Sequence, residues 1–144
     1  MCANTARQDA HAAWMSRRTT LWVGWILTAV PILMLVFGAW MAFVGAPQML
    51  DELVNRFGYR ASFAPVLGLI ELACAIVYAI PRTAVLGAIL LTGYLGGAIA
   101  THVRIGDPSF IIPLALAIVT WGGIYLRDDR LHALLPIRRP AGPR

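Results

Sequence analysis

The chain has 144 residues, of which 59% are hydrophobic and 13% charged, and its mean hydropathy is +0.70. These values exclude an ordinary soluble domain and indicate an integral membrane protein whose first partner is the lipid bilayer. The net charge is +5, and all twelve basic residues, lysine and arginine together, are arginine. Because the sequence has no aromatic and basic platform, we interpret this charge as attraction to anionic lipid headgroups and expect no nucleic-acid partner.

Four apolar stretches are long enough to cross a bilayer: residues 21–44, 62–80, 83–103 and 110–126. At about 1.5 Å per residue, each stretch spans roughly 25 to 36 Å, which brackets the hydrocarbon core. The sequence therefore predicts an all-α membrane protein with a four-transmembrane-helix bundle over residues 21–126. Residues 1–20 are expected to form a cytoplasmic N-terminal tail, and residues 127–144 a cytoplasmic interfacial C-terminal tail.

Residues 47–58, between the first two stretches, are expected to form a short amphipathic helix. Pro47 suits a first helical turn, and Gly58 suits a helix C-cap. One side of this helix carries the apolar residues Met49, Leu50, Leu53, Val54 and Phe57. We expect it to lie flat on the outer membrane surface, either as a lid without a role of its own or as a gate over a cavity.

The arginines are distributed unevenly between the two sides of the membrane. Nine of them flank the ends that include both termini, and only Arg56, Arg60 and Arg104 lie on the other side. The positive-inside rule therefore predicts a multi-pass protein with both termini in the cytoplasm. We expect the first stretch to be retained, because the residues before it are too many for an ordinary signal-peptide n-region.

Glu71 lies near the middle of the second stretch, where an ionisable side chain is costly. Helical spacing places Gly68 on the same face, and counting from the preceding turn places Gly93 and Tyr94 at the depth of Glu71. We therefore expect Tyr94 to be its hydrogen-bond partner, and we expect close helix packing at Gly68, Gly93 and Gly97. Two interpretations stay open, namely a polar clamp between helices and a site that handles protons or a ligand.

His102 ends the third stretch and is followed by Arg104, a fixed charge, and Asp107, a counter-charge or turn cap. A single imidazole near a span cannot supply two axial haem ligands, and no metal site is predicted. His102 is equally consistent with an interfacial anchor bonded to the next turn. Because Cys2 and Cys74 form no CxxC motif, a self-contained thiol oxidoreductase is not expected.

Five short segments also carry a family resemblance: residues 68–73, 80–83, 91–98, 101–108 and 121–128. In their order and spacing they resemble the DoxX-like family of small bacterial membrane proteins. The resemblance implies a four-helix bundle in the bacterial inner (cytoplasmic) membrane. It also implies that an acidic residue of the family corresponds to Glu71 and a family histidine to His102, followed by Arg104. Relatives include a subunit of thiosulfate:quinone oxidoreductase and a membrane component linked to oxidative-stress and thiol defence.

Three functions follow from these observations. The first is an accessory subunit of a quinone- or thiol-linked redox system, with ligand-binding residues Glu71, Tyr94, His102, Arg104 and Trp121. Such a subunit binds a quinone and has no covalently bound cofactor. It is at most a non-cofactor subunit of an oxidoreductase, because the electron carriers lie on a partner enzyme. The second is a small proton-coupled transporter, which has to form a homo-oligomer, and the third is a structural or assembly protein.

Overall fold

A computed structural model of the chain describes residues 2–128 and 131, with side chains from Arg18 onward. The predicted C-terminal tail therefore lies almost entirely outside the described residues. The elements run in the order α1 (Cys2–Phe43), α2 (Pro47–Asp51), a π-helical turn η1 (Glu52–Arg56), a 3-10 turn η2 (Ala61–Phe63), α3 (Ala64–Ala79), α4 (Ala84–Arg104), a 3-10 turn η3 (Pro108–Phe110) and α5 (Ile111–Arg127).

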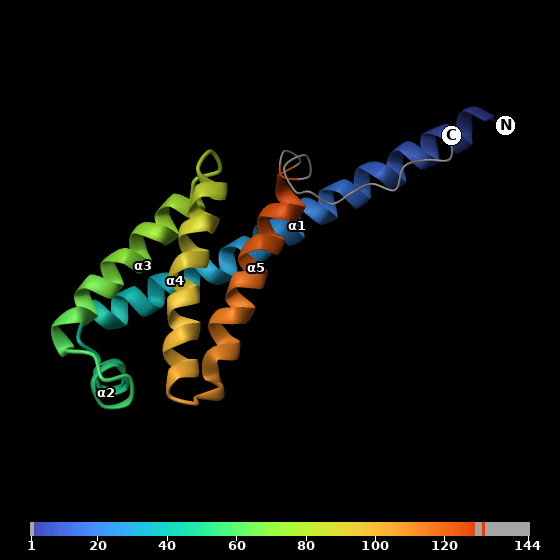
Figure 1. The fold of residues 1–144 in the computed structure, drawn as a ribbon. Coiled ribbons are helices and arrows are strands. Elements are labelled where there is room, and N and C mark those ends of the chain that lie inside the picture. The colour runs from blue at the N-terminus through green and yellow to red at the C-terminus, as the bar shows by residue number, and fades with distance from the viewer. Residues whose placement is uncertain (1, 129–130, 132–144) are drawn as a thin grey trace, which may run out of the picture.

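Four of these segments are long and apolar enough to span a membrane: Arg18–Phe43, Ala61–Ala79, Ala84–Arg104 and Pro108–Arg127. They confirm the predicted all-α architecture with four transmembrane helices. Figure 1 shows that α1 crosses the bundle and continues far beyond it toward the N-terminus. The helix begins earlier than the first apolar stretch because residues 2–23 contain several alanines and neither glycine nor proline.

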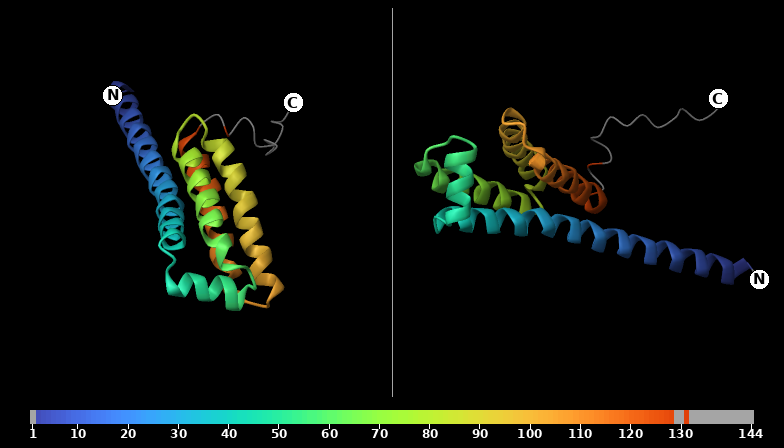
Figure 2. Two further views of the ribbon diagram at one scale, coloured as in Figure 1. Left: turned by 90° about the vertical axis from the view of Figure 1, so that its left-hand side faces the viewer. Right: turned by 90° about the horizontal axis from the view of Figure 1, so that it is seen from below.

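The spanning helices form a ring in which each helix has two neighbours. One flank of α1 packs against α3 and the other against α5, while α4 packs against the same two helices from the opposite side (Figures 1 and 2). Between α1 and α3 the chain crosses one end of the bundle as α2 and η1 (Figure 2). We call residues 47–57 the crossing segment. Gly58, with a φ of 75°, ends it in the left-handed conformation that favours glycine.

The tightest packing lies at the end of the bundle opposite the crossing segment. Tyr78 and Ile124 have no exposed surface there. A Cβ atom on Gly87 would lie 2.3 Å from the Cα atom of Tyr78, so α3 and α4 touch through their backbones. A Cβ atom on Gly123 would lie 2.8 Å from Thr28 Oγ1 and 3.0 Å from the Thr28 backbone nitrogen, so α5 and α1 also approach closely. We call this region, around Tyr78, Gly87, Thr28 and Gly123, the closed end.

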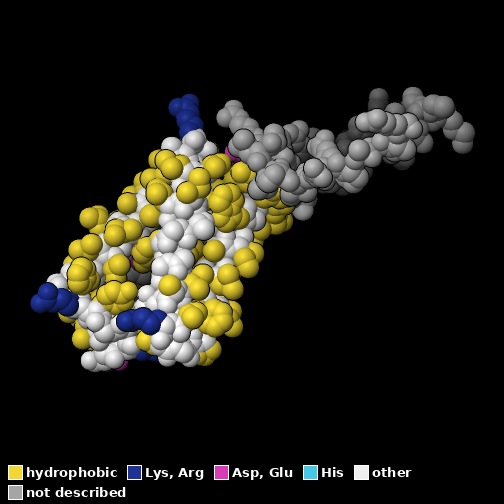
Figure 3. All heavy atoms as spheres, viewed as in Figure 1, with side chains coloured by type: hydrophobic (Ala, Val, Ile, Leu, Met, Phe, Trp, Pro, Cys, Tyr) yellow, Lys and Arg dark blue, Asp and Glu magenta, His cyan; other side chains and the backbone are white. Residues whose placement is uncertain are grey.

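Toward the crossing segment, α3 and α4 diverge (Figure 1). Gly93 and Gly97 of α4 have no atom of the described residues within 4 Å of a Cβ position. Within the described residues, the predicted GxxxG positions therefore do not pack α4 against another helix. Figure 3 shows a largely hydrophobic outer face with a hollow between these two helices. We call this region the open end.

Candidate ligand cavity at the open end of the bundle

Two adjoining cavities, each of about 330 Å³, occupy the open end. Both are lined by Tyr94, Ala98 and His102, which follow one another along a stripe of α4. The lateral cavity also involves the crossing segment and α3, and the central cavity also involves α1 and α5. Volumes of this size are at the lower end of the range for sites that bind small molecules.

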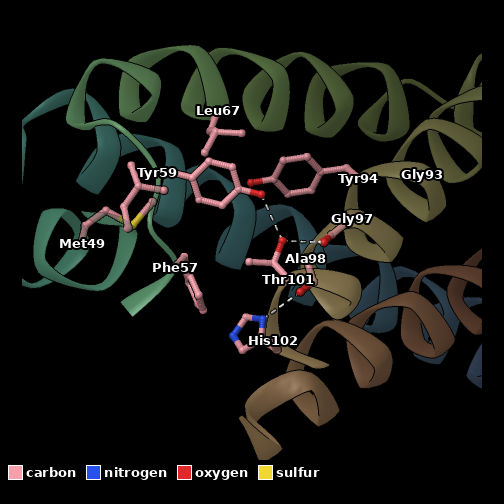
Figure 4. A pocket seen from close by; sticks show the side chains of 11 residues that line it. Met49, Phe57, Tyr59, Leu67, Gly93, Tyr94, Gly97, Ala98, Thr101 and His102 are labelled. Atoms are coloured by element: carbon pink, nitrogen blue, oxygen red, sulfur yellow. Dashed lines mark hydrogen bonds between the residues drawn. The ribbon is translucent and has the colours of Figure 1, made fainter. Parts of the chain in front are cut away.

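Figure 4 shows the lateral cavity, with Tyr94 and Tyr59 both projecting into it. Tyr59 Oη lies 3.3 Å from Thr101 Oγ1, and Thr101 Oγ1 donates a hydrogen bond of 2.9 Å to the Gly97 carbonyl. Because threonine has one hydroxyl proton, Tyr59 is the donor in the first of these contacts. Met49 and Phe57 of the crossing segment supply apolar lining (Figure 4).

The central cavity contains the intramembrane carboxyl group. Glu71 is only 9% exposed, and its side chain interacts with that of Tyr94, the partner expected from the sequence. The carboxyl group lies against Gly38 of α1, where a Cβ atom would come within 2.9 Å of Glu71 Oε1. Gly38 therefore provides the space that the carboxyl group occupies. The remaining lining is mainly aliphatic and includes Leu35 and Pro113.

His102 lies at the other end of the same stripe. Its Nδ1 atom lies 2.8 Å from the Ala98 carbonyl oxygen. The ring meets the Phe57 ring edge to face at a centroid distance of 4.9 Å, and Nε2 lies 3.8 Å from Asp107 Oδ2. His102 thus joins α4 to the crossing segment and to the turn that precedes α5.

Asp107 organises that turn. Its Oδ1 atom accepts a hydrogen bond of 3.0 Å from the Ser109 backbone N–H, which confirms the predicted turn cap. Its Oδ2 atom lies 2.9 Å from Nη2 of Arg56 in the crossing segment. The hydrogen bond from Ser109, together with the charges of Arg56 and His102, holds the pKa of Asp107 below its usual value.

The structure brings three of the five expected ligand-binding residues to one cavity, since Glu71, Tyr94 and His102 all line the central cavity. The other two line neither the central nor the lateral cavity. Arg104 donates to the backbone carbonyl of Phe57, and Trp121 Nε1 donates a hydrogen bond of 2.9 Å to Thr92 Oγ1.

Of the three glycines expected at helix-packing contacts, one lies at such a contact and two do not. Gly68 lies against α1, where a Cβ atom would meet Ala42 Cβ at 3.0 Å. Gly93 and Gly97 instead line the lateral cavity. Reading the sequence did not identify Gly38, although its spacing to Ala42 is a small-xxx-small pattern that could have indicated close approach.

A model of the DoxX-like family matches residues 26–123 of the chain. This range contains every residue that lines the two cavities. No curated protein and no solved structure matches the chain.

Proposed function

The chain belongs to the DoxX-like family, and on this premise we propose that it is an accessory subunit of a membrane redox system that holds a quinone-like ligand at the open end. One observation carries the proposal: the paired side chains of Glu71 and Tyr94 line a largely aliphatic cavity within the spanning helices. Ionisable groups at such a depth are costly and usually functional.

The shape and chemistry of the cavities fit an amphipathic ring compound. A quinone has an apolar ring and tail, and its two carbonyl oxygens accept hydrogen bonds. A phenol and a carboxylic acid can each donate such a bond, so Tyr94 and Glu71 together can hold one carbonyl. The adjoining lateral cavity and the hollow between α3 and α4 leave room for an apolar tail (Figure 3).

The depth of His102 limits the length of the ligand head. Tyr94 and His102 are eight residues apart, about 12 Å along the axis of α4. A six-membered ring with two carbonyl groups and one hydrogen bond of about 2.8 Å at the Tyr94 end fits within this length. In this proposal His102 and Phe57 bound the head of the ligand by contact, and the electron-carrying cofactors lie on a partner redox enzyme.

The charge distribution supports an orientation for this site. If the nine arginines on the side of the termini face the cytoplasm of a bacterial inner membrane, the open end faces the outer leaflet. We therefore propose that the ligand enters from that leaflet and that the partner enzyme docks near the crossing segment.

Quinone binding tests this proposal directly. The purified protein in nanodiscs is titrated with a short-chain ubiquinone, and binding is followed by quenching of its five tryptophans. Tyr94→Phe is expected to weaken binding about five- to tenfold, the value of one hydrogen bond. Glu71→Gln is expected to weaken it less, because an amide still donates a hydrogen bond but is a weaker donor than a carboxylic acid. Tyr78→Phe at the closed end is the matched control and should leave the affinity unchanged.

Unaltered affinity in both Glu71→Gln and His102→Ala would remove the proposed site. A protein that binds no quinone but copurifies with a larger membrane complex would instead favour the structural or assembly function.

A further inference from the structure

We propose that Glu52, His102 and Asp107 form a binding site for one divalent transition-metal ion at the open end. One ligand atom from each of these side chains lies within 4.8 Å of the others. His102 and Asp107 come from the two ends of one turn, between α4 and α5, and the fold brings Glu52 of the crossing segment to them. This site shares His102 with the proposed quinone site, and Glu52 also lines the central cavity, but neither Glu71 nor Tyr94 belongs to it.

The orientation of His102 is that of a metal ligand. A carbonyl oxygen can only accept a hydrogen bond, so Nδ1 must donate to the Ala98 carbonyl at 2.8 Å. In the neutral ring, Nε2 then carries a free lone pair. Metal-binding histidines commonly fix their tautomer in this way through a backbone carbonyl. The Nε2 atom lies 3.8 Å from Asp107 Oδ2.

The carboxylate of Asp107 presents a second ligand atom. Its side chain is 3% exposed, and Oδ2 accepts no hydrogen bond from the described part of the chain. His102 Nε2 and this buried anionic oxygen lie 3.8 Å apart, so both could bind one cation between them. Two ligands that each lie about 2.1 Å from an ion are at most about 4.2 Å apart, so the 3.8 Å gap already admits one.

Arg56 is the cation that neutralises the cluster when no metal is bound. Its Nη2 atom lies 2.9 Å from Asp107 Oδ2, and its Nη1 atom lies 3.1 Å from Glu52 Oε1. The Arg56 side chain is 48% exposed and that of Glu52 is 43% exposed, so both can rearrange without disturbing the core. A metal ion and the guanidinium group thus compete for the same two carboxylates.

The ligand set determines the class of ion. One imidazole nitrogen and two carboxylate oxygens suit Zn²⁺ and Mn²⁺, whereas Mg²⁺ prefers oxygen ligands and retains its water. Because Glu52 belongs to the crossing segment and the other two ligands do not, a bound ion would fasten this segment over the cavities.

The test uses the full chain in detergent and Zn²⁺ alone as the probe. The tails also contain Cys2, His11 and His132, so the background variant replaces these three with Ser, Ala and Ala. The affinity is measured by competition with a fluorescent zinc chelator. We expect one Zn²⁺ per chain, with an affinity that excess Mg²⁺ does not reduce.

Four variants distinguish this site from incidental binding. Glu52→Gln and His102→Ala should weaken Zn²⁺ binding at least tenfold, whereas Arg56→Gln should tighten it at least threefold because the competitor is lost. Asp51→Asn is the matched control: this carboxylate neighbours Glu52 in sequence but accepts a hydrogen bond of 2.7 Å from Asn55. Glu71→Gln, which weakens quinone binding in the proposal above, should leave Zn²⁺ binding unchanged.

The proposal is overturned if no Zn²⁺ is retained, or if Glu52→Gln binds as tightly as Asp51→Asn. An unchanged affinity in Arg56→Gln would also contradict it. The exposed position of Glu52 makes its variant decisive, since His102→Ala also removes ring packing against Phe57. Thermal unfolding of each variant without metal confirms that the comparison is made between folded proteins.

Discussion

The closed and open ends of the bundle use glycine for opposite purposes. At the closed end, Gly87 brings the backbone of α4 onto that of Tyr78, with no room for a Cβ atom. At the open end, Gly93 and Gly97 of the same helix face empty space, and both line the lateral cavity. Small residues in a membrane helix therefore mark either a contact or a cavity, and the spacing alone does not decide which.

The two ends also differ in how they satisfy buried polar groups. At the closed end, Tyr78 Oη donates a hydrogen bond of 2.8 Å to the Thr120 carbonyl, and Thr28 Oγ1 donates one of 2.8 Å to the Gly24 carbonyl. At the open end, Glu71 and Tyr94 are paired beside a cavity. One end thus buries its polar groups in close packing, and the other leaves a polar pair at the wall of a cavity.

The strongest test of this contrast adds one methyl group at each end. Gly87→Ala places a Cβ atom 2.3 Å from the Cα atom of Tyr78, so α3 and α4 must separate. We expect the free energy of unfolding to fall by about 3 kcal/mol, as for a severe overpacking substitution. Unfolding in detergent, followed by circular dichroism, measures the change.

Gly93→Ala is the matched control on the same helix. Because its Cβ position is open, stability should stay constant or rise by about 0.5–1 kcal/mol through helix propensity. Similar losses in both variants would refute the distinction between the two ends.

The second test fills the cavities without touching the closed end. Ala98 lies on the stripe of α4 that lines both cavities, so Ala98→Leu should displace a bound ligand. We expect quinone affinity to fall about tenfold, equivalent to about 1.4 kcal/mol. The same nanodisc titration measures it, and a thermal melt should show little change. A loss of stability with intact binding would contradict the assignment of Ala98 to a cavity wall.

The third test compares two tyrosines. Tyr78→Phe removes the interhelical hydrogen bond to the Thr120 carbonyl and should lower the free energy of unfolding by about 1 kcal/mol. Tyr94→Phe at the open end should change stability less and quinone affinity more. Urea or thermal unfolding measures the change in stability, and the quinone titration measures the change in affinity. A larger stability loss in Tyr94→Phe, or a larger affinity loss in Tyr78→Phe, would contradict the distinction between the two ends.

The smallest effect on stability is expected for Gly38→Ala. The added Cβ atom meets the Glu71 carboxyl group at 2.9 Å, but that group ends a flexible side chain and can turn into the central cavity. We expect the unfolding free energy to change by less than about 0.5 kcal/mol and quinone affinity to fall about threefold. Gly45 is unsuitable as a control. Only Leu50 Cδ1 lies near its Cβ position, at 3.8 Å, but its φ of 63° would strain any residue with a side chain. Gly96, with no described atom within 4 Å of its Cβ position, is the suitable one.

The sequence predicted the architecture because hydropathy and helix length depend only on local composition. The four stretches agree with helices that begin or end within a few residues, apart from the extended start of α1. The turn at Gly58 and the cap at Asp107 were also predictable, since glycine and aspartate have strong local preferences there.

The site was only partly predictable, because it depends on how helices approach one another. Depth counting along the helices identified Tyr94 as the partner of Glu71, since rise per residue is nearly constant. Rotation about the helix axis and the divergence of α3 from α4 are set by tertiary packing. For this reason Trp121, at a plausible depth, bonds Thr92 instead of lining a cavity, and Gly93 and Gly97 face space.

The backbone contact between Gly87 and Tyr78 bears on whether a solute could cross the membrane through this bundle. The lining residues of both cavities lie on the side of this contact nearer the crossing segment. Transport of a solute across the membrane would need a second opening, at the closed end. Such an opening would require Gly87 and Tyr78 to separate. In the proposed function, a ligand would therefore reach the cavities from one lipid monolayer only, and the contact at the closed end would separate it from the other monolayer.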